Sequence, residues 1–331
     1  VIIEKFDFKA VKCNGSYSII YQPSITGRED TITRLCVKRN AYLPSREMQS
    51  VLDFCCLFPI SVENHPKFSI TEIKKCIDDS GFERYLKTIS FSEFLSKFRN
   101  LFVGLKVMSD VGFVHSDIKR NNIVIDDGIF KFIDFDLSFQ VNRAELRENC
   151  SFNNPSNLFS TEELHVIFPT LPNIFILSHF GKVEFAEIRD HDIDEYIVYH
   201  RFFRSNIDNL EIQELLRKNL CLKKNEAQAF FTMKDALTDP TSIFFYISIY
   251  QLCTALATFL CCYRIDHYQS VIPFFMKVFD YHNNGFIDID STIQLYDLMR
   301  MEVDNVKSPV SVFQLDKIIH DDKRRKVEED S

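Results

Sequence analysis

Residues Val114 to Ser138 read V-H-S-D-I-K-R-N-N-I-V-I-D-D-G-I-F-K-F-I-D-F-D-L-S, and this stretch decides the fold. Two apolar runs, 123–125 and 130–133, flank the turn sequence Asp126-Asp127-Gly128. An Asp-Gly pair between apolar runs is typical of a β-hairpin, because both residues tolerate the positive φ angles of a tight turn. The sequence therefore predicts a loop, a strand, a turn and a second strand that ends on an acid, Asp134.

This hairpin would gather three oxygen-bearing side chains at one end. Asp117 and Asn122 come just before the first strand, and Asp134 comes just after the second. Two carboxylates and an amide around a hard cation suit Mg²⁺ that carries nucleotide phosphates. A surface hairpin with an acidic turn would explain Asp126 and Asp127, but it would not explain the polar residues on both sides of the hairpin.

Residues His115 to Asn122, H-S-D-I-K-R-N-N, resemble the catalytic loop of the eukaryotic-type protein kinases, H-R-D-L-x-x-x-N, and Asp134-Phe135-Asp136 resembles their D-F-G. The resemblance implies ATP and Mg²⁺ as cofactors, with Asn122 and Asp134 as the metal ligands. It implies that Asp117 orients the acceptor hydroxyl and takes its proton, and that Lys119 stabilises charge on the transferred phosphoryl group.

Two residues depart from the family pattern. Ser116 replaces the arginine that senses a phosphorylated activation loop, and Asp136 replaces the glycine after Asp-Phe. Control by a phosphorylated activation loop is therefore not implied for this chain. The flexibility that glycine gives to the turn after Asp-Phe is not implied either.

Residues 11–21, V-K-C-N-G-S-Y-S-I-I-Y, resemble the strand-loop-strand that covers the ATP phosphates in this family. Of the pattern G-x-G-x-x-G-x-V only the central Gly15 is present, followed by Ser16, and Ile20 replaces the valine. An ordinary hairpin turn would have a similar sequence. The position of this segment before the catalytic loop favours a phosphate-covering lid that includes Gly15, Ser16 and Ile20.

Three further residues complete the expected ATP site. Lys38 ends the strand-like run T-R-L-C-V-K, as does the family's phosphate-binding lysine, and a solvated lysine is the alternative. Glu47 lies in the first turn of a helix expected over residues 45–58 and is the candidate partner of Lys38, with Asp53 as a fallback. Glu72 ends the strand-like run 67–72, where the resemblance places main-chain groups against adenine.

The composition limits the class of protein. With 331 residues, of which 46% are hydrophobic, the chain can bury a large core in one domain or two lobes. A net charge of −8 argues against a general nucleic-acid-binding protein. The ten cysteines lack metal-type spacing, which favours reduced thiols and predicts an intracellular, cytoplasmic protein. The basic run 323–326 leaves the nucleus open.

Residues 243–262 form an apolar run that is long enough to span a membrane. Four polar residues interrupt it, so we expect a buried core helix and no membrane span: Ser248, Gln251, Thr254 and Thr258. The preceding Asp239-Pro240-Thr241-Ser242 resembles the start of the central helix in the kinase family, and Asp239 would then brace the catalytic loop.

The resemblance implies an α+β, two-lobed protein-kinase-like fold with a small antiparallel sheet and a larger helical lobe. We expect an N-terminal ATP-binding lobe over residues 1–73 and a helical lobe over 74–306, with an insertion at about 165–238. Phenylalanines at helical spacing predict a long amphipathic helix over 90–111. The charged tail, 307–331, is typical of disorder.

These features together predict a serine/threonine protein kinase that acts on protein hydroxyl groups. One alternative is a small-molecule kinase resembling the aminoglycoside and choline phosphotransferases, which Ile133-Asp134-Phe135-Asp136 also fits. Another is a scaffold that keeps the kinase fold with little or no catalysis. Lys119, two residues after the expected base, favours the protein kinase.

Overall fold

The structure, a computed structural model, describes residues 11–14, 18–21, 24, 28–37, 44–65, 68–76, 79–136, 138–140, 210–212, 214–215, 241–260, 271–280 and 287–305. Several sequence predictions concern residues outside these ranges. They are the lid residues Gly15 and Ser16, the cation Lys38, the brace Asp239, most of the expected insertion and the C-terminal tail.

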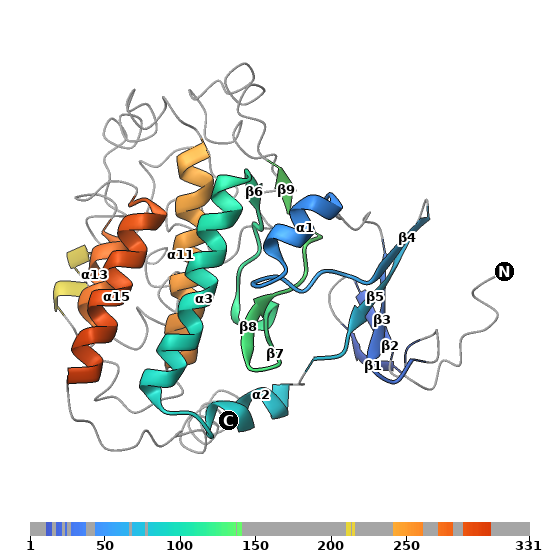
Figure 1. Ribbon diagram of the computed structural model, residues 1–331, viewed down its shortest axis with the longest axis horizontal. Helices are drawn as coiled ribbons and strands as arrows, with labels where there is room; N and C mark the ends of the chain where they lie inside the picture. Colours follow the sequence, from blue (N-terminus) through green and yellow to red (C-terminus); the bar gives the residue numbers. More distant parts are fainter. Residues whose placement is uncertain are drawn as a thin grey trace, which may run out of the picture.

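A five-stranded antiparallel sheet forms one end of the molecule (Figure 1). Its strands are β1 (Val11–Asn14), β2 (Ser18–Tyr21), β3 (Thr31–Val37), β4 (Ser61–His65) and β5 (Phe68–Lys74), in the order β1-β2-β3-β5-β4. β3 is central and rich in β-branched residues, which suit a pleated surface. The expected small antiparallel sheet is therefore confirmed.

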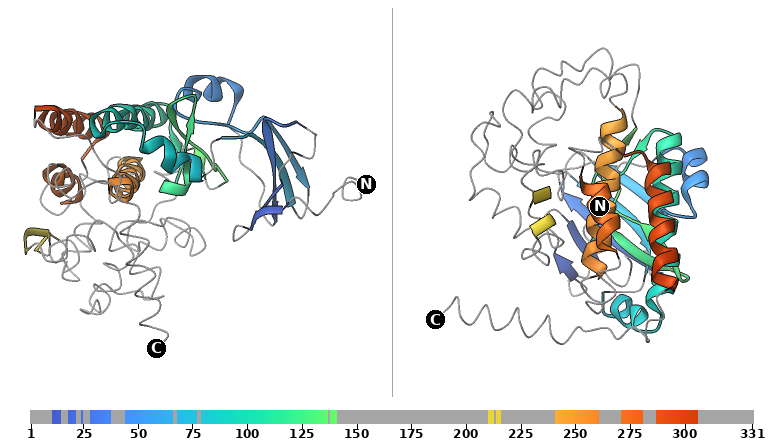
Figure 2. Two further views of the ribbon diagram at one scale, coloured as in Figure 1. Left: turned by 90° about the horizontal axis from the view of Figure 1, so that it is seen from below. Right: turned by 90° about the vertical axis from the view of Figure 1, so that its left-hand side faces the viewer.

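Helices form the other end of the molecule. They are α1 (Arg46–Leu52), α2 (Asp79–Leu86), α3 (Phe91–Asp110), α11 (Thr241–Leu260), α13 (Ile272–Phe279) and α15 (Ile289–Asn305). Figure 2 shows α3 and α15 in one layer and α11 and α13 in a second layer beneath it. We call α2, α3, α11, α13, α15 and the hairpin that packs on α3 the helical body.

The long helix predicted over 90–111 is confirmed as α3. Its first turn is capped by Ser90, whose hydroxyl accepts a hydrogen bond from the Glu93 amide at 3.1 Å. One face of α3 is fully buried in an aromatic core that includes Phe94, Phe98 and Phe102. Apolar residues three and four apart lie on the same helix face, which explains why the core follows this spacing.

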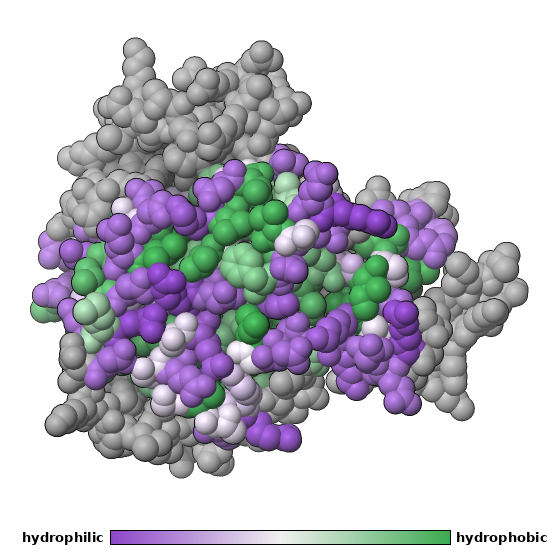
Figure 3. Space-filling model, viewed as in Figure 1, coloured by the Kyte–Doolittle hydropathy of each residue, from purple (hydrophilic) through white to green (hydrophobic). Residues whose placement is uncertain are grey.

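Residues 243–260 of the apolar run lie in α11, and the side chains from Tyr246 to Leu260 are almost all buried against α3, α13 and α15. The predicted buried helix is confirmed. Within the described part of the chain, no helix combines the length and apolarity needed to cross a bilayer. On the face of the molecule that Figure 3 shows, the coloured residues are mostly hydrophilic, and a hydrophobic band crosses the helical body.

Helix α1 is shorter than the helix predicted over 45–58, because the chain leaves it to bind the hairpin. The Leu57 amide donates to the Phe132 carbonyl at 2.9 Å, and the Phe132 amide donates to the Cys55 carbonyl at 2.8 Å. The Asn100 side chain of α3 donates to the Phe54 carbonyl at 3.1 Å. Residues 46–58 thus dock on the helical body, although the chain runs from them back into the sheet at β4.

Candidate active site

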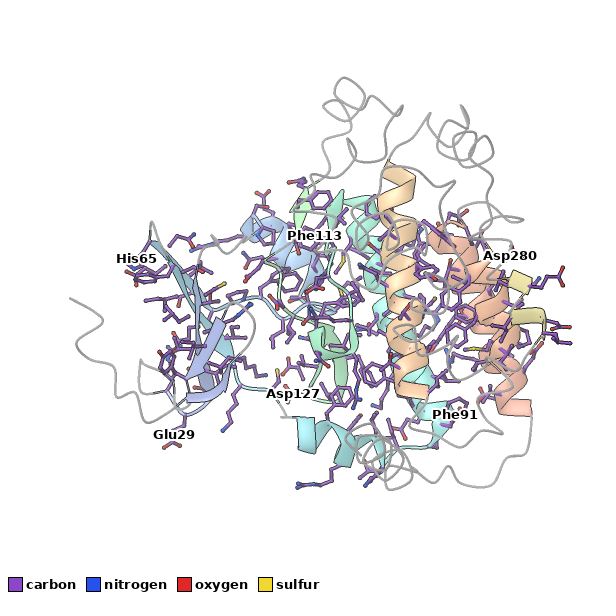
Figure 4. The ribbon with its side chains drawn as sticks, turned by 180° about the vertical axis from the view of Figure 1, so that it is seen from behind. Glu29, His65, Phe91, Phe113, Asp127 and Asp280 are labelled. Atoms are coloured by element: carbon purple, nitrogen blue, oxygen red, sulfur yellow. The ribbon has the colours of Figure 1, made fainter. Side chains whose placement is uncertain are left out.

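The predicted hairpin is confirmed. β7 (Ile123–Asp126) pairs with β8 (Ile129–Phe132), and the turn residues Asp127 and Gly128 have φ angles of 50° and 79°. Figure 4 shows Asp127 at the hairpin tip, between the sheet and the helices. At the opposite end, the hairpin meets the loop that contains the expected catalytic residues.

A short strand pair closes the base of this loop. β6 (Phe113–Val114) pairs with β9 (Phe139–Gln140), so the chain enters and leaves the segment 115–138 at one place. The Ser138 hydroxyl also donates to the His115 carbonyl at 3.1 Å. The loop and the hairpin are therefore held as one unit, packed on α3 and α11.

His115 joins the two halves of this unit. Its Nδ1 accepts a hydrogen bond from the Asp117 amide at 3.3 Å, so in the neutral ring the proton is on Nε2, which donates to the Ile133 carbonyl at 3.0 Å. Burial lowers the pKa of His115 to about 4, so the ring is neutral at pH 7. His115 thus fixes the residue before Asp134 relative to Asp117.

Asp117 is held by two side chains of its own loop. Its Oδ2 accepts from the Lys119 ammonium at 2.7 Å and from the Asn122 amide at 2.8 Å. Burial raises the pKa of Asp117, while the charge of Lys119 acts in the opposite direction. Both of these bonds use Oδ2, and the side-chain contacts described for Asp117 leave Oδ1 available as an acceptor.

Asn122 and Asp134 lie next to each other across the base of the hairpin. The Ile133 amide donates to the Asn122 carbonyl at 3.0 Å, which sets Asp134 beside the loop. The Asn122 Nδ2 group donates to both the Asp117 carbonyl and Oδ2, each at 2.8 Å, so only the side-chain Oδ1 of Asn122 can act as a cation ligand. A carboxylate and an amide oxygen match the hard ligands of Mg²⁺.

Two residues of the site have left-handed backbone conformations without being glycine. Ser116 has φ 58° and Asp134 has φ 67°. Such conformations cost roughly 1–2 kcal/mol per residue for L-amino acids, so the surrounding structure must hold them.

Gln251 of α11 holds the first of these residues. Its Nε2 donates to the Ser116 carbonyl and its Oε1 accepts from the Ile118 amide, both at 3.2 Å. The side chain is fully buried. The sequence predicts Asp239 as a brace of this loop, and Asp239 lies outside the described residues; among the described residues, Gln251 braces the loop. The signal in the sequence was that Gln251 is the one amide side chain among the four polar residues of this apolar run.

The cation that meets Asp134 comes from the sheet, and it is Arg34 of β3. Its Nη1 lies 2.7 Å from Asp134 Oδ1, and its Nη2 lies 3.4 Å from Asp134 Oδ2 and 3.1 Å from Asp136 Oδ2. Burial lowers the pKa of Arg34, but the two carboxylates outweigh it and raise the pKa above the ordinary value. The sequence predicts Lys38 as the cation of the sheet, and Lys38 lies outside the described residues.

Of the other predicted nucleotide-binding residues, the structure describes Ile20, Glu47 and Glu72. Ile20 is the register partner of Arg34 in the neighbouring strand and is half-buried. Glu47 is exposed in the first turn of α1, where an acid is favourable. Glu72 lies within β5, where its carbonyl accepts a hydrogen bond from the Ile60 amide at 2.7 Å.

The carboxylate of Glu72 also has internal partners. Its Oε1 accepts hydrogen bonds from Thr31 at 2.8 Å and from Ser24 at 3.0 Å. Glu72 is buried, and these hydroxyl groups satisfy the carboxylate. Glu72 is therefore a structural residue of the sheet in the described structure.

A second ion pair links the sheet to the hairpin at its other end. Lys74 of β5 lies 2.6 Å from Asp126 and 3.5 Å from Asp127. Together with Arg34, it ties the sheet to both ends of the hairpin, and so sets the distance between the sheet and the loop.

No family model and no curated protein matches this chain. Among the described residues, no group of three or more His, Cys, Asp and Glu side chains has the arrangement of a metal site.

Proposed function

We propose that this chain is an ATP-dependent phosphotransferase, and that it acts as a serine/threonine protein kinase with a two-lobed kinase-like fold. The observation that supports this proposal best is the cluster of Asp117, Lys119, Asn122 and Asp134, joined by hydrogen bonds through His115 and Ile133. The order and spacing of these residues match the catalytic loop and the metal-binding acid of the resemblance described above.

Asp117 supplies the proton acceptor. In a phosphoryl transfer, the acceptor hydroxyl loses its proton as its oxygen approaches the phosphorus atom. The Lys119 and Asn122 bonds hold the carboxylate of Asp117 in one orientation, which leaves Oδ1 to receive that proton. Lys119 is half exposed, so its ammonium can reach both Asp117 and a negatively charged group outside the loop.

Asp134 and Asn122 would hold a divalent cation through one carboxylate and one amide oxygen. When bound, Mg²⁺ neutralises part of the phosphate charge and orients the terminal phosphate. Arg34 is the sheet residue that contacts the same carboxylate.

The test is transfer of labelled γ-phosphate from ATP to casein by the wild type, by Asp117→Asn and by a matched control. Removal of a positioned general base typically lowers the rate by about 10²–10⁴-fold. Asp127→Asn is the control, because Asp127 is an exposed turn residue and asparagine also adopts its left-handed conformation. Equal transfer by the wild type and Asp117→Asn would reject the proposal.

The second candidate function is phosphorylation of a small amino-alcohol. The observation that favours it is Asp136, which follows Asp134-Phe135 as in the aminoglycoside and choline phosphotransferases and is engaged by Arg34. The same assay with a panel of amino-alcohols in place of casein separates the two functions. If neither class is phosphorylated and ATP with Mg²⁺ does not raise the melting temperature, the chain is a scaffold.

A further inference from the structure

The Arg34 side chain connects the sheet to two acids that flank Phe135. The guanidinium group contacts both oxygens of Asp134 and one oxygen of Asp136. The three side chains are only 16%, 28% and 14% exposed, in the order Arg34, Asp134 and Asp136. Solvent therefore screens these charges less than it screens a surface ion pair, and the electrostatic attraction between Arg34 and the two acids is stronger.

This contact conflicts with cation binding at Asp134. Each oxygen of the Asp134 carboxylate already accepts one hydrogen bond from Arg34, and a divalent cation would bind these same two oxygens. The positive charges of Arg34 and of a divalent cation repel each other at one carboxylate, so cation binding at Asp134 competes with the contact from Arg34.

Asp136 gives Arg34 a second place to bind. Nη2 of Arg34 is closer to Asp136, at 3.1 Å, than to Asp134, at 3.4 Å. The main chain of Arg34 is fixed in the central strand, between Ile20 of β2 and Thr71 of β5, so only the side chain needs to move. A guanidinium group has five donors in one plane, and it can keep one contact while it gives up another.

We propose that Arg34 is a switchable bridge between the sheet and the active-site loop, with Asp136 as its permanent partner and Asp134 as its exchangeable one. Without nucleotide, Arg34 binds both acids. When a divalent cation with its nucleotide occupies Asp134, Arg34 stays on Asp136 and directs the released edge of its guanidinium group at the phosphates. This inference rests on the proposed function, because it assumes that Asp134 is a cation ligand.

The proposal gives Asp136 a role that its position in the sequence left unexplained. A glycine there could not retain Arg34 after Asp134 is released. Asp136 is therefore a positioning residue, which acts on the nucleotide site through Arg34. Asp136 also acts on Cys36 of β3. The pKa of the Cys36 thiol is raised chiefly by burial and also by the negative charge of Asp136.

The test measures Mn²⁺ binding to the nucleotide-free chain by electron paramagnetic resonance, because this readout does not depend on catalysis. Arg34→Ala removes the competing cation and should tighten Mn²⁺ binding by about tenfold, as expected for loss of a charged hydrogen bond that competes for the site. Asp134→Asn should abolish this binding. Lys74→Ala, which removes the ion pair at the other end of the hairpin, should leave it unchanged.

A double-mutant cycle tests the role of Asp136. Asp136→Asn should weaken Mn²⁺ binding, because Arg34 then has only Asp134 as a strong partner, and because one negative charge is lost. In the Arg34→Ala background only the loss of charge remains, so the effect of Asp136→Asn should be smaller. Equal effects of Asp136→Asn in both backgrounds would reject the anchoring role.

Each outcome separates the bridge from the proposed function. If Arg34→Ala leaves Mn²⁺ affinity unchanged or weaker, the bridge is wrong even where phosphotransfer is observed. If Mn²⁺ affinity changes as expected but no acceptor is phosphorylated, the bridge stands and the kinase assignment fails. If Arg34→Ala does not fold, Arg34→Lys, which keeps the charge but loses the planar fork, should bind Mn²⁺ with intermediate affinity, and wild-type affinity would overturn the proposal.

Discussion

Replacement of Gln251 by leucine is the sharpest test of how the loop is held. The substitution keeps the size of the side chain and removes one donor and one acceptor at a fully buried position. The Ser116 carbonyl and the Ile118 amide then lose this partner where water cannot replace it. At roughly 1–3 kcal/mol for each group, less the strain recovered if Ser116 relaxes from its left-handed conformation, we expect a loss of about 3 kcal/mol.

Urea unfolding at pH 7 measures this loss, and hydrogen exchange locates it. The Ile118 amide should exchange faster in Gln251→Leu, because its acceptor is removed. Thr254→Val on the same helix is the matched control, since the Thr254 hydroxyl bonds the Tyr250 carbonyl within α11, and this change should cost about 1 kcal/mol or less. If Gln251→Leu costs no more than the control and Ile118 keeps its protection, the bracing role is wrong.

Three further predictions concern the loop and its support. Lys119→Ala should move the acid limb of the pH–rate profile to higher pH, because Lys119 lowers the pKa of Asp117 and the base must be ionised; an unmoved limb would contradict this. The pKa of His115 is about 4 in the folded chain and about 6.5 in the unfolded chain. As the pH falls, the imidazole of the unfolded chain is therefore protonated first. The free energy of unfolding should fall by about 3 kcal/mol between about pH 6.5 and about pH 4. Urea titrations should show this component in the wild type and not in His115→Asn. Gly104→Ala should destabilise the chain by about 1–3 kcal/mol in urea unfolding, because the added methyl would lie 2.7 Å from Cys55 Cβ, and an unchanged midpoint would refute that clash.

The features that were predictable from sequence are those set by neighbours along the chain. The Asp127-Gly128 turn fixes the pairing of β7 with β8, and that pairing in turn places Asp134 beside Asn122. The spacing of phenylalanines similarly identifies α3. Local sequence was sufficient here because the hairpin turn and the helical spacing of apolar residues each depend on residues that are close together in the chain.

The features that were missed depend on contacts between distant segments. Gln251 lies 133 residues from Ile118, and nothing local relates a buried amide to that loop. Arg34 and Lys38 are separated by an even number of residues in the sequence, so the two-residue period of a strand predicts the same face for both and does not decide which of them meets Asp134. β4 was not predicted from the sequence, because its residues are mainly exposed and do not alternate between apolar and polar.

The docking of residues 46–58 on the helical body affects how the molecule can be divided. The chain passes between the sheet and that body three times, from β3 to α1, from Leu57 back to β4, and from β5 to α2. A fragment that ends at residue 73 would carry Leu52, Cys55 and Cys56 without the core that buries them. The remaining fragment would lack the segment that covers Gly104 and bonds the outer edge of β8. Neither half is therefore an independent folding unit. Proteolytic cleavage at the β5–α2 junction should give two fragments that stay bound to each other.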